Sequence, residues 1–144
     1  MPEPPLTGGC QCGAVRYAIT AQPLWLFACH CRECQKQSAS AFGISLVVRH
    51  AAVTLTRGET RTWSRKADSG RTVHCVFCTT CGTRVWHERE GVDVVSIKGG
   101  SLDAPLDFSQ AIHCWTSRRL PGVVIPSNAR QFPAEPAVSP PGDA

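Results

Sequence analysis

Hydrophobic and polar residues alternate along many short stretches of the chain, which is the pattern of half-buried β-strands. In residues 72–77, for example, Val73, Cys75 and Phe77 fall on one face. Similar stretches, rich in β-branched and aromatic residues and separated by turn residues, predict strands over 14–20, 43–50, 54–58, 60–65, 71–77, 83–89, 92–97 and 111–116. A helical turn is indicated over residues 31–40. The pattern therefore predicts a mostly β fold of small antiparallel sheets around one core.

The length of 144 residues and the hydrophobic content of 42% suit one compact domain. We expect an N-terminal lead over residues 1–8, a folded domain over 9–126 and a proline-rich tail over 127–144 that is disordered or loosely draped. The chain has no signal-peptide pattern and no apolar run of the roughly 20 residues that would span a bilayer. We therefore expect a cytoplasmic protein that does not enter a membrane.

Nine cysteines are the most unusual feature of the composition. They indicate either a disulfide framework or metal ligation. The number is odd, no export signal is present, and most of the cysteines are separated by only one or two residues. This spacing, together with a reducing compartment, favours metal ligation.

Two cysteine pairs look like the two halves of one closed metal site. Cys10 and Cys12 are one residue apart, Cys78 and Cys81 are two residues apart, and each pair is followed by glycine. Glycine readily takes a positive φ, which lets backbone N–H groups turn toward a thiolate. We predict a structural four-thiolate site for zinc. Iron is the alternative, but the cysteine spacing of ferredoxins is absent.

A second group of cysteines leaves two alternatives open. Cys29, Cys31 and Cys34 lie within one short turn and provide three thiolates. Either they hold a zinc ion with a vacant fourth position, as a catalytic zinc site requires, or Cys75 completes a second closed site. The strand alternation around Cys75 favours a small core residue, and Cys114 is interpreted in the same way.

The formal charge of the protein changes once the metal ions are counted. Seven thiolates add seven negative charges and two Zn²⁺ return four positive charges, so the formal net charge of +4 falls to +1. Arg61 and Arg65 flank Trp63, but they do not form the basic, aromatic-interleaved surface of single-strand binders. We therefore expect no nucleic-acid partner.

Four segments of the chain resemble a known family. GGCQCGAVRY, CHCRECQKQSAS, FCTTCGTRVW and GGSLD, in this order and spacing, are similar to the glutathione-dependent formaldehyde-activating enzymes, also called the centromere protein V domain. The resemblance implies a zinc-stabilised β-tent with two zinc ions. It assigns a structural zinc to Cys10, Cys12, Cys78 and Cys81, and a catalytic zinc to Cys29, Cys31 and Cys34.

The resemblance also implies an activity. The expected enzyme is a carbon-sulfur lyase that adds glutathione, or a similar thiol, to formaldehyde or another small aldehyde and gives S-hydroxymethylglutathione. Arg32, Lys36 and Gln37 follow the ligand turn and are candidates for holding glutathione carboxylates. Gly122 stands where the family commonly has an aromatic residue, which leaves the aldehyde and the thiol open. The alternative function is a non-enzymatic, zinc-stabilised binding module.

Overall fold

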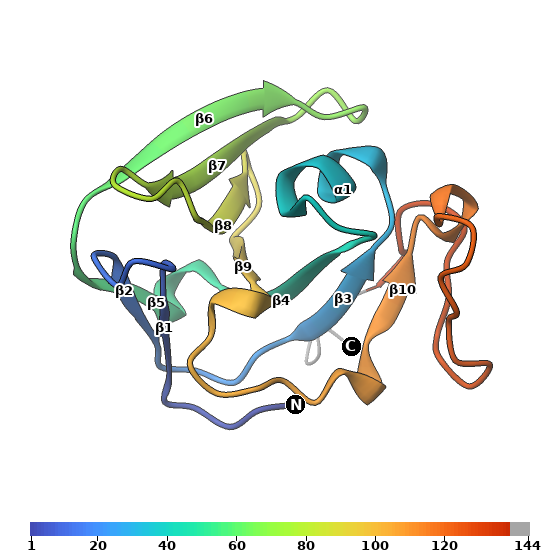
Figure 1. Ribbon diagram of the computed structural model, residues 1–144, viewed down its shortest axis with the longest axis horizontal. Helices are drawn as coiled ribbons and strands as arrows, with labels where there is room; N and C mark the ends of the chain where they lie inside the picture. Colours follow the sequence, from blue (N-terminus) through green and yellow to red (C-terminus); the bar gives the residue numbers. More distant parts are fainter. Residues whose placement is uncertain (139–144) are drawn as a thin grey trace.

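The computed structural model describes residues 1–138 and consists of two β-sheets, one α-helix and four short 3-10 helices (Figure 1). One sheet has three strands and the other has seven. Nearly all neighbouring strands are antiparallel. The prediction of a mostly β fold with antiparallel sheets is therefore confirmed.

The smaller sheet has the strand order β1-β2-β5, with β1 at Leu6–Gly9, β2 at Arg16–Ile19 and β5 at Val53–Arg57. Gly8 in β1 is paired with Tyr17 in β2. A Cβ atom at Gly8 would overlap the Tyr17 hydroxyl and the Ser101 carbonyl oxygen, so this strand needs glycine at that position.

The larger sheet has the strand order β10-β3-β4-β9-β8-β7-β6. Its strands are β3 (Trp25–Cys29), β4 (Gly43–Arg49), β6 (Thr60–Lys66), β7 (Thr72–Cys78), β8 (Arg84–Arg89), β9 (Val94–Lys98) and β10 (Ile112–Cys114). The exception to the antiparallel pattern is β10, which pairs parallel to β3. The C-terminal ends of β3 and β10, which are far apart in the sequence, therefore lie side by side.

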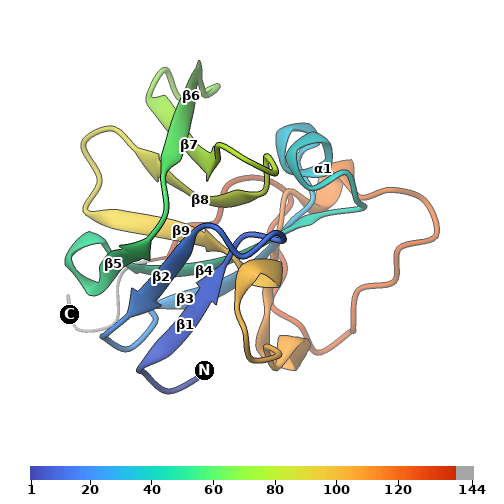
Figure 2. The same cartoon turned by 60° about the vertical axis from the view of Figure 1, so that its left-hand side comes forward.

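The hydrophobic core lies between the two sheets. Leu46 and Ile97 of the larger sheet and Tyr17 and Ile19 of the smaller sheet have essentially no exposed surface. The rings of Tyr17 and Trp86 meet edge to face, with centroids 5.9 Å apart. Figure 2 shows the β1–β2 hairpin in front of β4 and β9. Burial of these large side chains is the main force that holds the sheets together.

The other face of the larger sheet carries polar and sulfur-containing side chains, and we call it the helix face. Ser45 and Lys98 are paired across β4 and β9, next to the core residues Leu46 and Ile97. His87 and Cys75 are similarly paired across β8 and β7. Because side chains alternate along a strand, residues next to core positions point to the opposite face. In Figure 1 the helix α1 (Arg32–Ser38) lies on this side of the sheet.

Two strands in the structure, β1 and β3, were not predicted. β1 contains two glycines, which have low strand propensity. β3, with the sequence WLFAC, is an apolar run without alternation. A short apolar run of this kind does not distinguish a strand from a buried helical segment.

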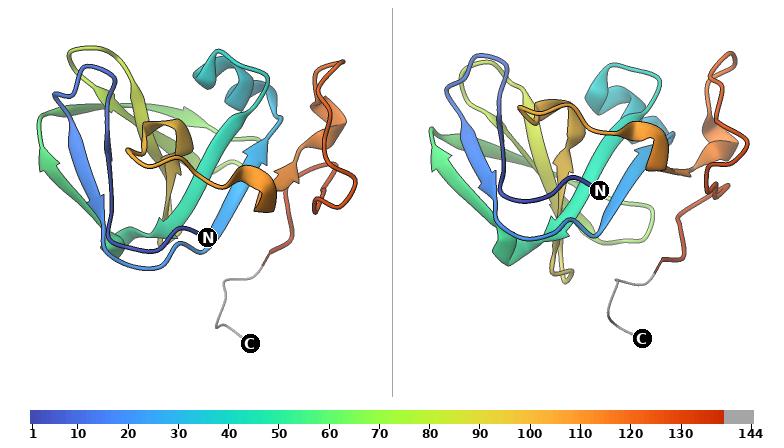
Figure 3. Two further views of the ribbon diagram at one scale, coloured as in Figure 1. Left: turned by 60° about the horizontal axis from the view of Figure 1, so that its bottom comes forward. Right: turned by 90° about the horizontal axis from the view of Figure 1, so that it is seen from below.

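Part of the predicted proline-rich tail is hydrogen bonded to the β10 region. The His113 N–H donates to the Arg130 carbonyl over 2.9 Å, and the Phe132 N–H donates to the His113 carbonyl over 2.9 Å. Figure 3 shows this part of the chain running beside the last strand. Residues 139–144 of the tail lie outside the described residues, and the domain boundaries stay a prediction. None of the helices in residues 1–138 has the length and apolar character needed to cross a bilayer.

Candidate metal centres

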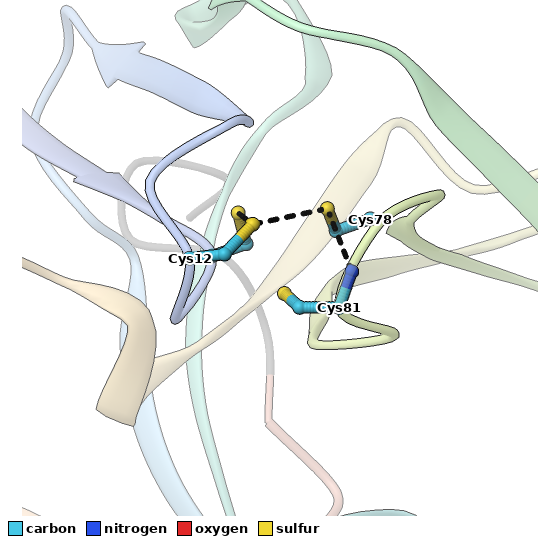
Figure 4. A group of neighbouring side chains, drawn as sticks. Cys12, Cys78 and Cys81 are labelled. Carbon is cyan, nitrogen blue, oxygen red and sulfur yellow. Dashed lines mark hydrogen bonds between the residues drawn. The ribbon is translucent and has the colours of Figure 1, made fainter.

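Four cysteines from distant parts of the chain meet at one point. Cys10 follows β1, Cys12 lies in the next turn, Cys78 ends β7, and Cys81 lies in the β7–β8 turn. Their sulfur atoms all lie within 4.8 Å of one another. The Cys10 and Cys12 sulfurs are 3.5 Å apart, and the Cys12 and Cys78 sulfurs are 3.9 Å apart. Figure 4 shows Cys12, Cys78 and Cys81 pointing toward one another. This four-cysteine cluster links the smaller sheet to the larger one.

The backbone around these thiols has the turn geometry expected from the glycines. Gly13 has φ 80° and Gly82 has φ 75°, both in the left-handed region. The Val15 N–H donates to the Cys10 sulfur over 3.2 Å, and the Thr80 N–H donates to the Cys78 sulfur over 3.3 Å. Backbone donors of this kind stabilise the negative charge of a thiolate.

The thiols of the four-cysteine cluster differ in their readiness to ionise. Hydrogen bonds from the Thr83 hydroxyl and backbone lower the pKa of Cys81 to about 5. A backbone hydrogen bond at Ala14 lowers the pKa of Cys12, but the neighbouring thiols of Cys10 and Cys81 outweigh it and raise this pKa to about 11. Adjacent thiolates repel, so they do not all ionise unless a cation lies between them.

Cys29, Cys31 and Cys34 form a second group, which we call the three-cysteine cluster. Their sulfur atoms also lie within 4.8 Å of one another, and all three residues are partly exposed. Cys29 is the last residue of β3, Cys31 is the N-cap of α1, and Cys34 lies in the first turn of the helix. The Cys34 N–H donates to the Cys31 sulfur over 3.3 Å, so the helix start itself fixes the distance between these two thiols.

One thiol of the three-cysteine cluster ionises far more easily than the other two. Hydrogen bonds from Cys29 and Cys34 lower the pKa of Cys31 to about 2, although burial acts in the opposite direction. The neighbouring thiol of Cys114, followed by that of Cys31, raises the pKa of Cys29. Cys29 and Cys31 likewise raise the pKa of Cys34. Without a metal ion the cluster therefore holds one thiolate and two thiols at neutral pH.

Three residues near the second cluster do not belong to it. Cys75 is buried on the helix face and Cys114 is buried beside Cys29, but neither sulfur joins a metal-ligand group among the described residues. His30 is fully buried, and its Nε2 lies 3.0 Å from His113 Nδ1. Burial, followed by the charges of His113 and Arg119, lowers the pKa of His30. Within residues 1–138 the cluster thus offers three candidate protein ligands.

The spacing of the sulfur atoms fits a tetrahedral metal ion. A Zn–S bond of about 2.3 Å places two sulfurs of a tetrahedron about 3.8 Å apart. The measured distances of 3.5 and 3.9 Å in the four-cysteine cluster are close to this value. An all-sulfur ligand set favours soft or borderline metals such as zinc over magnesium or calcium. The two clusters are therefore compatible with zinc.

The three residues predicted to hold carboxylates lie in different places. Arg32 is exposed, donates from Nη1 to Gln35 Oε1 over 2.9 Å, and lines a small pocket of about 380 Å³. Gln37 lines a different and larger cleft of about 760 Å³. Lys36 is exposed and lines neither of these two spaces. Their role in binding a substrate stays a prediction.

The structure also brings Lys98 and Arg84 to the larger cleft, and neither residue is expected there from the sequence pattern. Lys98 is only 8% exposed. The signal in the sequence is a lysine that directly follows the apolar strand VVSI. Such a lysine is normally interpreted as the exposed end of a strand, and only the three-dimensional arrangement shows that it is buried.

The fold and the two cysteine clusters define a small β protein with two candidate metal sites. The sequence model of the family described as glutathione-dependent formaldehyde-activating enzyme matches residues 5–118. The chain belongs to this family. A crystal structure of a Rhodobacter sphaeroides protein has a similar fold, with a TM-score of 0.57, 22% sequence identity, and coverage of 74% of this chain and 98% of the other.

Proposed function

We propose that the protein is a zinc-dependent carbon-sulfur lyase that adds glutathione, or a similar thiol, to formaldehyde or another small aldehyde. Membership of the family supports a glutathione-linked function in general. The observation that carries the specific proposal is the three-cysteine cluster, which has three protein ligands and is partly exposed. A catalytic zinc site has this composition, because the fourth position takes a water molecule or the substrate.

The reaction itself is a simple addition. The thiol sulfur forms a bond to the carbonyl carbon, the π electrons of the C=O bond move to the oxygen, and the proton of the thiol ends on that oxygen. A bound zinc ion would lower the pKa of an incoming thiol and polarise the carbonyl group. The chain contributes the cluster geometry, because the Cys34 N–H and the end of β3 hold the three sulfurs in place.

The four-cysteine cluster has a different role in this proposal. It joins β1 to the β7–β8 turn, and so it would hold the two sheets together. Both clusters need free thiols, so the proposal also includes a reducing compartment such as the cytoplasm.

The test is an exchange measurement by NMR on formaldehyde and glutathione, with the zinc-loaded protein at substoichiometric concentration. The wild type should accelerate the exchange over buffer. Cys29→Ser should lose one zinc ion and the acceleration while the fold is kept. Cys75→Ala is the matched control, because Cys75 is a buried thiol outside both clusters, and it should keep two zinc ions and the activity.

Two results would argue against the enzyme. If the wild type with both sites loaded gives no acceleration, the namesake reaction is rejected. If Cys29→Ser unfolds the protein to the same extent as the loss of Cys78 does, the three-cysteine cluster is structural. The protein is then a zinc-stabilised binding module.

A further inference from the structure

Lys98 is a buried cation on the helix face, close to the three-cysteine cluster. Its side chain ends 2.8 Å from the ring of His87, measured between Lys98 Nζ and His87 Nδ1. A lysine ammonium has only donors, so Nδ1 accepts and the ring proton of His87 lies on Nε2. Within residues 1–138 this is the one hydrogen bond of Nζ, and no carboxylate forms an ion pair with it. Two N–H groups of Lys98 are therefore left for another partner.

His87 does not neutralise the charge of Lys98. Burial, followed by the positive charges of Lys98 and Arg89, holds the pKa of His87 well below its usual range. The ring is neutral at physiological pH, and the pair as a whole is cationic. Burial also lowers the pKa of Lys98, Cys34 acts in the opposite direction, and the positive charge of Arg84 lowers it further.

Arg84 on β8 is a second cation without a full set of partners. Its Nε is buried and has no hydrogen-bond partner among the described residues. Its guanidinium carbon lies 5.9 Å from the ring centroid of Trp63, so one face of the group is covered by an aromatic ring. A buried donor without an acceptor is costly, and native proteins normally satisfy it. Two such cations next to each other indicate a site for an anion.

Lys98 and Arg84 line the same cleft, whose volume of about 760 Å³ falls in the range of small-molecule sites. The cleft runs along the C-terminal part of α1, where Gln37 and Phe42 also line it. Gln37 also lies next to one residue of the three-cysteine cluster, Cys34. A Cβ atom built on Gly43 would lie 2.8 Å from Gln37 Nε2 and 3.1 Å from Cys34 Cβ, so these two side chains are neighbours.

Two further charged side chains of the cleft, Arg16 and Asp103, neutralise each other. Arg16 and Asp103 lie at a different part of the wall and form an ion pair, in which Asp103 also accepts from the Thr7 hydroxyl over 2.6 Å. Arg16, followed by Thr7, lowers the pKa of Asp103 to about 2, so this carboxylate is fully ionised at neutral pH. Arg16 is therefore already paired, whereas Lys98 and Arg84 are cations of the cleft that form no ion pair with a carboxylate of residues 1–138.

We propose that Lys98 and Arg84 bind a carboxylate of the thiol substrate, so that the protein selects thiols with an anionic tail over neutral thiols. The inference rests on the proposed function, in which the thiol sulfur enters the three-cysteine cluster. The carboxylate end of the molecule would then lie in the cleft, and its thiol end at the three-cysteine cluster, whose Cys34 is a neighbour of the cleft residue Gln37. The residues proposed to contact the carboxylate, Lys98 and Arg84, differ from those predicted from the sequence, which were Arg32, Lys36 and Gln37.

The experiment measures binding without catalysis. S-methylglutathione has no free thiol, and its dimethyl ester lacks both negative carboxylates. Their dissociation constants for the zinc-loaded wild type, Lys98→Met, Arg84→Gln and Lys66→Met are measured by calorimetry or NMR titration. Lys66→Met is the matched control, because it removes an exposed lysine of β6 that lines neither space. Zinc content and circular dichroism identify any variant that has lost its fold.

The wild type should bind the acid at least tenfold more tightly than the ester. Lys98→Met and Arg84→Gln should each weaken binding of the acid by about 10- to 100-fold and leave binding of the ester unchanged. Lys66→Met should change neither. Equal binding of acid and ester by the wild type, no binding of the acid, or an equal loss for both ligands in the two folded variants would overturn the anion site.

This inference and the proposed function fail in different ways. If S-methylglutathione binds through its carboxylates but the wild type does not accelerate thiol addition, the anion site stands and the lyase function falls. In the opposite case, the wild type is active but Lys98→Met raises KM equally for glutathione and for the neutral thiol 2-mercaptoethanol. The lyase function then stands, and Lys98 serves only as a counter-charge for the anionic metal cluster.

Discussion

Cys114 on β10 and Cys29 on β3 occupy paired positions in the parallel ladder between these strands, and Cys114 is the group that most strongly raises the pKa of Cys29. A fourth thiol thus stands beside the three-cysteine cluster without belonging to it. The position of Cys114 matters for the proposed function, because a fourth protein ligand would close the site.

We expect Cys114→Ala to keep two zinc ions per chain, whereas Cys29→Ala should keep one. The reason is that the Cys29 sulfur lies within 4.8 Å of the other two sulfurs of the cluster, whereas Cys114 is not part of that group. Zinc content after dialysis, measured by atomic emission on folded protein, gives the two numbers. Loss of one zinc ion from Cys114→Ala would make Cys114 a ligand and the cluster a closed one.

Zinc binding at the three-cysteine cluster should depend steeply on pH. Cys31 is already a thiolate at neutral pH because its pKa is about 2, whereas the raised pKa values of Cys29 and Cys34 keep these two thiols protonated. Three thiolates are needed for binding, so two protons leave when the metal ion enters. The affinity should therefore rise about 100-fold for each unit of pH, and fall by the same factor as the pH is lowered.

Calorimetric titration of zinc in buffers of different ionisation enthalpy counts these protons, and a chelator competition at several pH values gives the slope. The four-cysteine cluster is filled beforehand so that one site is observed. Release of three protons at pH 7 would show that Cys31 is protonated in the metal-free cluster. A slope near zero would show that all three thiols are already ionised.

The turns that carry the cysteines were predictable because their geometry is local, and the two distant halves of the four-cysteine cluster were recognised from their matching pattern of paired cysteines followed by glycine. Gly13 and Gly82 take the positive φ that the sequence pattern indicates, and the spacing of Cys31 and Cys34 matches the first turn of a helix. Distant contacts carry no such local signal. The parallel pairing of β10 with β3 depends on the whole sheet, so the position of Cys114 beside Cys29 could not be read from the sequence.

The burial of Lys98 also could not be predicted from the sequence, because it depends on distant contacts. Lys98 is buried because β8, β9 and α1 surround it, and the sequence around it indicates an exposed strand end. The alternation around Cys75 correctly indicated a buried residue, but this residue lies on the helix face and not in the core between the sheets. Alternation identifies two faces of a strand, and it does not identify which tertiary neighbour covers each face.

Ala39 should be a site where glycine stabilises the protein. This exposed residue ends α1 in the left-handed conformation, with φ 49°. Glycine takes this conformation without steric cost, so Ala39→Gly should raise the free energy of unfolding by about 0.5–1 kcal/mol. Gly91, with φ 73° in the β8–β9 turn, is the opposite case, and Gly91→Ala should lower the free energy of unfolding by about 1 kcal/mol.

Urea denaturation of the zinc-loaded protein measures both changes under the same conditions. Ala39 and Gly91 are both exposed, and neither residue belongs to a cysteine cluster. The zinc content should therefore stay at the wild-type value. Destabilisation by Ala39→Gly would show that a side-chain contact of Ala39 outweighs the backbone strain.

Gln35 ties the helix of the three-cysteine cluster to two other parts of the chain. It is 8% exposed, and its Nε2 donates to the His30 carbonyl over 2.7 Å and to the Arg118 carbonyl over 3.0 Å. Gln35→Leu keeps the size of the side chain but leaves both carbonyl groups without this donor, so the free energy of unfolding should fall by about 1–3 kcal/mol. Lys36→Leu, on the exposed side of the same helix, should change it by less than about 0.5 kcal/mol.

The effect of Gln35→Leu should extend to the metal, because His30 lies between the candidate ligands Cys29 and Cys31 in the chain. A looser backbone at this position lets the sulfurs separate, so zinc should leave the three-cysteine cluster before it leaves the four-cysteine cluster when a chelator is added. Chelator titration of Gln35→Leu and Lys36→Leu, followed by zinc release and circular dichroism, measures the order. Equal zinc release from both variants would show that the cluster holds its geometry through the sulfur atoms and the Cys34 N–H alone.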